Sequence, residues 1–188
     1  MIYLISDLHL FHDRAFIYKP RGFECVADMN ATIIDNWNKT IKPDDDVYVI
    51  GDFALGSDFD LIRKTISALP GRIHLIIGNH DTDKKIELYH SMPNMVEIVY
   101  ATTLTVGNRK LYLSHYQTLT ASLETSPDHA IYNIHGHIHT KDKFTDDNPY
   151  FYNVCCDAHD CMPVSVDKVL ADIWSEIIEC RTFLEDPV

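Results

Sequence analysis

Residues 44–55 read DDDVYVIGDFAL, in which the apolar run VYVI is followed directly by Gly51 and Asp52. Consecutive apolar positions without polar alternation are typical of a strand that is buried on both faces. Similar short runs recur along the chain: MIYLIS at 1–6, IHLII at 73–77, KLYLS at 110–114, AIYNI at 130–134 and FYNV at 151–154. The sequence therefore predicts a largely buried β-sheet structure.

Helical patterns lie between several of these runs. Apolar residues recur at fourfold spacing over 28–41, and a similar stripe follows over 62–69. Near the C-terminal end, Ser165 is placed to cap a helix whose apolar stripe covers 166–178. Gly and Asn at 107–108 predict a hairpin turn, so the later strands are expected to include antiparallel pairs. Alternating strands and helices predict an α/β fold with helices outside the sheet.

The composition argues against several classes of function. Of 188 residues, 46% are hydrophobic and 23% charged. This is typical of a globular protein, and the length favours one domain over 1–188. The formal net charge is -12 and the basic residues are scattered, so duplex nucleic acid is not an expected partner. No stretch approaches the roughly 20 apolar residues of a membrane span. The five cysteines follow no disulfide spacing, which indicates free thiols and predicts a cytoplasmic location.

Aspartate, asparagine and histidine residues follow the apolar runs. In chain order they are Asp7, His9, Asp52, Asn79, His80, Asp81, His115, His137 and His139. Ligands of an open α/β sheet bind beyond the carboxyl ends of its strands, so these groups are expected to face one crevice. Each motif alone is weak, because Gly-Asp or Asp-x-His often marks an ordinary turn. Turn formation and core packing give no reason for the same chemistry to recur at successive strand ends.

These residue types are suitable metal ligands. Imidazole nitrogen, carboxylate and amide oxygen suit divalent Zn, Mn, Fe, Co or Ni, and no thiolate is needed. The ligands expected are Asp7, His9, Asp52, Asn79, His115, His137 and His139, which are too many for one tetrahedral site. If one carboxylate bridges two metal ions, the seven residues can bind a pair of ions about 3.5–4 Å apart.

In these motifs the chain resembles the calcineurin-like metallophosphoesterases. The matching residues are Asp7-x-His9, Gly51-Asp52, Gly78-Asn79-His80-Asp81, His115 and Gly136-His137-Ile138-His139, in the family's order. The stretch from MNATIIDNWN through DDDVYVIGDFAL also looks like small bacterial and phage members. The resemblance implies a four-layer α/β/β/α sandwich with two mixed sheets and a dinuclear metal site between them.

The resemblance also implies a role for each ligand. One metal is bound by Asp7, His9 and His139, the other by Asn79, His115 and His137, and Asp52 bridges them. The implied reaction is phosphoester hydrolysis, in which a water or hydroxide between the two metals attacks phosphorus. Mn is favoured for activity.

His80 matches the family position that protonates the leaving oxygen. Many phosphatases of the family have a second carboxylate that orients this histidine, but Leu55 stands at that place here. Asp81 or Asp58 is available for the orienting role, or no residue fills it. The departure argues against a protein-phosphatase-like activity more than against the metal site.

Other polar residues near these motifs have less specific readings. His12 and Arg21 are expected to touch the substrate phosphate, with a surface-loop histidine as the alternative for His12. The segment CCDAHDC at 155–161 fits either a structural zinc site or, better, a turn near the rim of the active site. His135, the last residue of its strand, is expected to be a packed histidine rather than a ligand.

The resulting functional hypothesis is a cytoplasmic phosphodiesterase that needs two divalent metal ions and acts on a small or flexible phosphoester substrate. The alternatives are a phosphomonoesterase or single-strand nuclease, and a non-catalytic scaffold with the same fold. The scaffold reading ranks last, because scaffold members typically lose ligands or the catalytic histidine, and all are present here. Neither a membrane nor duplex nucleic acid is expected as a partner, and the sequence leaves the oligomeric state open.

Overall fold

The computed structural model describes residues 1–120, 130–145 and 148–185, and the side chains only as far as residue 179. The first sheet has the strand order β10-β1-β2-β3-β4. Its strands are β1 (Ile2–Ile5), β2 (Asp46–Ile50), β3 (Arg72–Ile76), β4 (Met95–Val99) and β10 (Val164–Ser165). The strands β1 to β4 are parallel and β10 pairs with β1 in the antiparallel sense, so the sheet is mixed.

The second sheet has the order β5-β6-β7-β9-β8. Its strands are β5 (Ala101–Val106), β6 (Arg109–Ser114), β7 (Ile131–His135), β8 (Phe144–Thr145) and β9 (Asn148–Asn153). The inner strands β6, β7 and β9 are parallel, and each edge strand is antiparallel to its neighbour. The hairpin between β5 and β6 turns at 107–108, which confirms the turn expected there.

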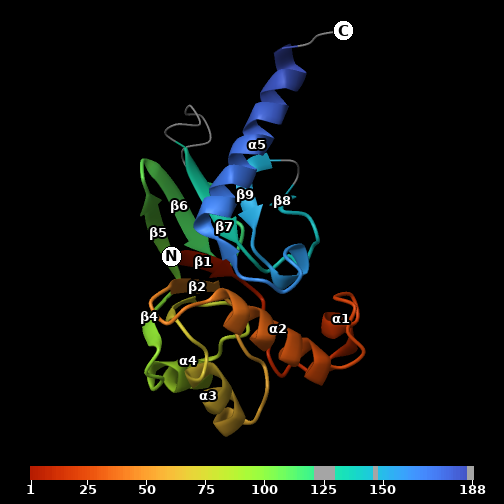
Figure 1. Cartoon of the computed structure of the whole chain (residues 1–188), viewed down its shortest axis with the longest axis vertical. Helices are drawn as coiled ribbons and strands as arrows, with labels where there is room; N and C mark the ends of the chain where they lie inside the picture. Colours follow the sequence, from red (N-terminus) through yellow and green to blue (C-terminus); the bar gives the residue numbers. More distant parts are fainter. Residues whose placement is uncertain (121–129, 146–147, 186–188) are drawn as a thin grey trace.

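Helices pack on both sheets (Figure 1). They are α1 (Ala15–Tyr18), α2 (Val26–Thr40), α3 (Phe59–Ser67), α4 (Asp83–His90) and α5 (Val166–Glu185), with a 3₁₀ turn η1 (Cys156–Ala158) before β10. The helices α2, α3 and α4 lie together on one side of the first sheet, and α5 runs alongside the second. The α/β fold with two mixed sheets is thus confirmed.

Two apolar clusters fix this arrangement. In the first, side chains of β1, β2 and β3 such as Val49 and Leu75 pack against α2, α3 and α4, including Trp37. In the second, Ile50 and the other inward residues of the first sheet meet the second sheet and the stripe of α5 that includes Ile173. Because neighbouring strand residues point to opposite faces, the first sheet is buried on both sides, as its apolar runs predict.

Some boundaries differ from expectation. No apolar run marks β4, and β5 is implied only by the hairpin turn at 107–108. The polar composition of 141–149 indicates a loop, but this segment contains β8 and the start of β9. The predicted cap at Ser165 is confirmed, since its Oγ accepts a hydrogen bond from Lys168 N at 3.2 Å. The sequence indicates a loop at His129, which lies outside the described residues. No helix in the described part of the chain combines the length and apolar character needed to cross a bilayer.

Candidate metal centre

The strand ends of both sheets converge on one site. Asp7, Asp52 and Asn79 follow β1, β2 and β3 of the first sheet, while His115 and His137 follow β6 and β7 of the second. Backbone hydrogen bonds join these segments: Asp7 N donates to Gly51 O at 3.1 Å, and Ser6 N donates to Val154 O at 2.9 Å. All seven expected ligands are therefore brought to the junction of the two sheets.

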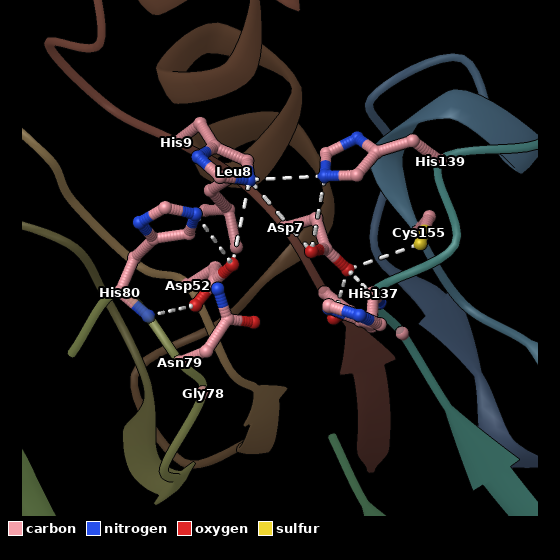
Figure 2. A network of polar contacts seen from close by, with 12 residues as sticks. Asp7, Leu8, His9, Asp52, Gly78, Asn79, His80, His137, His139 and Cys155 are labelled. Atoms are coloured by element: carbon pink, nitrogen blue, oxygen red, sulfur yellow. Dashed lines mark hydrogen bonds and ion pairs between the residues drawn. The ribbon is translucent and has the colours of Figure 1, made fainter. Parts of the chain in front are cut away.

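Asp7, His9 and His139 form one group that is able to hold a metal ion. Figure 2 shows the two imidazole rings above the Asp7 carboxylate. The Nε2 atoms of His9 and His139 lie 3.1 Å apart, and they are 3.7 Å and 3.4 Å from Asp7 Oδ1. The structure thus assembles the three residues that the family resemblance assigns to one ion.

One oxygen of this group has no hydrogen-bond partner. Asp7 is fully buried, and its Oδ2 accepts hydrogen bonds from Ser6 Oγ, His137 N and Cys155 Sγ. Its Oδ1 is buried without any donor. A buried carboxylate oxygen without a donor carries a desolvation penalty, which a cation beside it removes. Asp7 Oδ1, facing two imidazole nitrogens, therefore fits a metal ion.

A second group forms around Asp52 and His115, with Asp7 as its third member. His115 Nε2 lies 3.6 Å from Asp52 Oδ2 and 2.9 Å from Asn79 Oδ1. The same Asp52 oxygen is 3.6 Å from His9 Nε2, so it lies between the two groups. The ring of His137 is 5.1 Å from that of His115. The Asp52 carboxylate therefore belongs to one group and also lies close to the other.

The electrostatic surroundings favour the ionised form of Asp7 and the neutral forms of His9 and His137. Burial alone would raise the pKa of Asp7, but the facing histidines His9, His115 and His139 hold it well below the usual range. Burial lowers the pKa of His9 and His137. Burial also acts to lower the pKa of His139, but the carboxylates of Asp157 and Asp7 outweigh it and raise the value. A neutral imidazole has a free lone pair, as metal binding requires.

Five of the expected ligands have left-handed backbone conformations. The φ angles are 55° at Asp7, 49° at His9, 55° at Asp52, 73° at His137 and 50° at His139. Each such residue costs about 1–2 kcal/mol relative to ordinary backbone. Strain of this kind persists where the surrounding structure imposes it, and it concentrates at functional sites.

Two glycines are required by close approach. A Cβ on Gly78 would lie 2.3 Å from Asp52 Oδ1, and one on Gly136 would lie 1.9 Å from Ser6 Oγ. Gly136 has no positive φ, so its backbone conformation does not require glycine. It is needed because no side chain fits between it and Asp7.

His80 lies beside the site with its side chain 46% exposed (Figure 2). Its Nε2 is 4.0 Å from Asp52 Oδ2, and its backbone N donates to Asp52 Oδ1 at 2.8 Å. The two carboxylates considered for orienting it have other contacts. The Asp81 carboxylate accepts hydrogen bonds from the backbone N–H groups of Asp52, Phe53 and Gly78. The Asp58 carboxylate caps α3 by accepting a hydrogen bond from Leu61 N. Asp81 thus positions the loops that carry Asp52 and His80, rather than the imidazole ring.

His12 is half-buried, whereas the Arg21 side chain is almost fully buried. His12 Nδ1 is 3.2 Å from His9 Nδ1, and burial together with neighbouring cations lowers its pKa to about 4. Arg21 is 2% exposed and donates to Asp157 through Nε and Nη2, and to Asp7 O through Nη2 at 2.8 Å. The donors of Arg21 thus face protein acceptors, which gives it a positioning contact, and its phosphate contact stays a prediction.

Asp157 is a site residue that the motif patterns missed. Its Oδ2 lies 3.0 Å from His139 Nδ1 and 2.8 Å from Arg21 Nη2. Burial would raise its pKa, but His139 and Arg21 hold it at about 2. A carboxylate on the far nitrogen of a ligand histidine fixes the ring's orientation and tautomer. The only sequence signal was its place in the polar segment 155–161.

The rest of that segment forms a turn at the site, as expected. Cys155 contacts Asp7, while Cys156 and Cys161 are buried as free thiols. The metal-binding groups found among the described residues include no cysteine, so a zinc site there has no support. His159 Nε2 is 2.9 Å from Asn153 O. His135 is fully buried between Gly136 O and Thr145 Oγ1, at 3.0 Å and 3.2 Å.

Comparisons with known proteins agree with this geometry. The model of the calcineurin-like phosphoesterase superfamily domain matches residues 1–156, a range that includes every expected ligand. The solved structure of the protein of unknown function AQ665 from Aquifex aeolicus is similar, with a TM-score of 0.69 and 26% identity over 90% of this chain and 97% of that one.

Curated relatives come from an archaeon and a phage. MJ1445 of Methanocaldococcus jannaschii is 42% identical over 81 residues, which is 43% of this chain and 46% of that protein. The chain therefore matches less than half the length of that relative. The Gene 66 protein of Mycobacterium phage D29 is 27% identical over 201 residues, covering 92% of this chain and 96% of the relative.

Proposed function

Because the chain belongs to the calcineurin-like phosphoesterase superfamily, we propose that it is a phosphohydrolase that uses two divalent metal ions. The proposed activity is that of a phosphodiesterase on a small or flexible substrate. The observation that carries the proposal is the buried Asp7 Oδ1, which has no donor and faces His9 and His139. A structural carboxylate at this depth would be expected to have both oxygens hydrogen-bonded.

The residues divide between two ions. Asp7, His9 and His139 would hold one, and Asn79, His115 and His137 the other, with Asp52 shared. When bound, such ions acidify a water molecule and neutralise phosphoryl oxygens. The ligand set of imidazole, carboxylate and amide oxygen suits Zn, Mn, Fe, Co or Ni, and Mn is the metal proposed for activity.

His80 supplies the proton for the leaving group in this proposal. Its side chain is 46% exposed and lies next to Asp52, so it reaches both the site and solvent. A proton held on its imidazole can be given to the departing ester oxygen. General acid catalysis of this kind typically contributes about 10² to 10⁴ in rate.

The preference for a small diester rests on two features. The net charge of -12 disfavours an extended polyanionic duplex. Leu55 stands where many phosphatases of the family carry a carboxylate. Its backbone N donates a hydrogen bond to Leu10 O, which holds the segment after β2 against the segment after β1. A phosphomonoesterase or single-strand nuclease is the alternative.

We also propose that 1–188 is one domain located in the cytoplasm. The single-domain proposal is supported by α5, which lies outside the matched range 1–156 but places Val169 and Ile173 in the apolar cluster shared by the two sheets.

Hydrolysis of bis-p-nitrophenyl phosphate and p-nitrophenyl phosphate by Mn²⁺-loaded protein tests the proposal. We expect a higher kcat/KM for the diester. A higher value for the monoester would favour the phosphomonoesterase. Hydrolysis of neither, with metal bound, would favour the scaffold reading.

A further inference from the structure

Two aromatic side chains are exposed beside the candidate metal centre. Phe16 of α1 is 69% exposed, and Tyr116, just after β6, is 52% exposed. Other large apolar side chains of the described residues are exposed too, but these two rings lie next to the candidate site, where a flat ring offers a surface on which a ligand can stack. Neither ring belongs to the buried core, so core packing does not account for them.

Each ring contacts a different half of the site. The Phe16 ring lies edge-on to His12 at 5.8 Å, and His12 stacks on His9 at 5.2 Å. The Tyr116 ring lies 4.8 Å from His137 and 5.2 Å from His115. The two aromatic rings therefore flank the group around His9 and the group around His115, respectively.

Both side chains project from anchored backbone. Tyr116 O accepts hydrogen bonds from Ser114 Oγ and Thr118 Oγ1 at 2.8 Å and 3.0 Å. Phe16 precedes Ile17, which is buried and fixes the short helix to the core. Rings with fixed bases lose little further entropy when a flat group stacks on them, which favours binding.

We propose that Phe16 and Tyr116 bind the two organic substituents of an aromatic or nucleobase-containing phosphodiester, one on each side of the phosphorus. This inference rests on the proposed function. His80 lies 5.5 Å from the His9 ring and 6.1 Å from the His12 ring, on the Phe16 side. The leaving group therefore stacks on Phe16, and the substituent retained on phosphorus stacks on Tyr116.

Two asymmetric diesters with the same p-nitrophenolate leaving group test this assignment. One is methyl p-nitrophenyl phosphate, and the other is phenyl p-nitrophenyl phosphate. The ratio of kcat/KM for the phenyl over the methyl ester measures recognition of the retained substituent. Replacing an aromatic that stacks on a ligand typically weakens binding about fivefold or more.

We expect Tyr116→Leu to lower this ratio about fivefold or more, and Tyr116→Phe to keep it. Phe16→Leu should lower kcat/KM for both esters and keep the ratio. Trp174, a 40% exposed aromatic on α5, provides the matched control, and Trp174→Leu should keep the ratio. An unchanged ratio in Tyr116→Leu, with metal content equal to wild type, overturns the inference. A ratio lowered by Phe16→Leu instead overturns the assignment of sides.

Binding provides a readout that does not depend on turnover. Calorimetry should show tighter binding of phenylphosphonate than of methylphosphonate to the Mn²⁺-loaded protein. The double variant Phe16→Leu, Tyr116→Leu should lose this difference. Equal affinities in the wild type overturn the stacking inference even if both diesters are hydrolysed. Absence of hydrolysis alongside a clear binding difference overturns the proposed function but supports the stacking.

Discussion

Asp157 joins two buried groups beneath the candidate metal centre, and its removal has a calculable cost. Its carboxylate accepts from Arg21 Nε at 3.1 Å and from Nη2 at 2.8 Å, and it lies 3.0 Å from His139 Nδ1. The side chains of Asp157 and Arg21 are 8% and 2% exposed. Asp157→Ala would therefore leave a buried guanidinium without its counterion.

Removing one partner of a buried ion pair costs about 3–5 kcal/mol. For a chain of this length, each 1 kcal/mol lowers Tm by about 2–4 °C. We therefore expect Asp157→Ala to lower Tm by about 6–20 °C. Adding Arg21→Met removes the unpaired charge, so part of this loss should be recovered. Loss of the carboxylate that orients His139 should also weaken Mn²⁺ binding about 10- to 100-fold.

Thermal unfolding followed by circular dichroism, in EDTA, separates the ion pair from the metal. The four proteins needed are wild type, Asp157→Ala, Arg21→Met and the double variant. Calorimetric Mn²⁺ titrations of the same set measure the effect on His139. A double variant whose loss of stability is the sum of the two single losses would refute the coupling. Unchanged Mn²⁺ affinity in Asp157→Ala would show that Asp157 does not orient His139.

Three further predictions concern other residues. His80→Ala should keep its bound Mn²⁺ and lower kcat about 10²- to 10⁴-fold; unchanged kcat would remove His80 from the mechanism. His135→Gln should lose less bound metal than His137→Gln, as measured by mass spectrometry of dialysed protein, and equal losses would make His135 a ligand. Hydrogen bonds from Arg72 and His74 lower the pKa of Asp46 from 3.8 to about 2, and they outweigh the opposing effect of its partial burial. Its ionised form thus stabilises the fold fully above pH 3.8, and this contribution is lost as the pH falls through about 2. Because Arg72 is 55% exposed, Asp46→Asn should lower the free energy of unfolding at pH 7 by only about 1 kcal/mol in urea titrations. A difference of undiminished size at pH 2 would contradict this.

The central strands could be predicted from sequence because they are buried on both faces. The edge strands could not. β4 (MVEIV) and β5 (ATTLTV) border the two sheets, and most of their side chains are only partly buried. Polar residues therefore interrupt the apolar pattern that marks an inner strand. The same holds for β8, which has two residues and is recognised only by its pairing with β9.

The candidate site could be predicted where a side chain able to bind a metal ion directly follows a strand. Asp7, Asp52 and His115 stand at such positions, and the structure brings them together. The contacts of Asp157 could not be predicted, because they depend on how the turn after β9 packs against His139 and Arg21. The contacts of Arg21 with Asp157 and Asp7 could not be predicted for the same reason: a sequence shows that a guanidinium is present but not which acceptor it faces.

Turnover by protein of known metal content decides whether the site works as proposed. Wild-type protein dialysed against Mn²⁺ is analysed for bound ions and assayed in the same sample with bis-p-nitrophenyl phosphate. We expect two ions per chain and hydrolysis that stops when EDTA removes them and returns when Mn²⁺ is restored. Two bound ions per chain without hydrolysis, or hydrolysis that survives complete removal of metal, would contradict a metal-dependent phosphodiesterase.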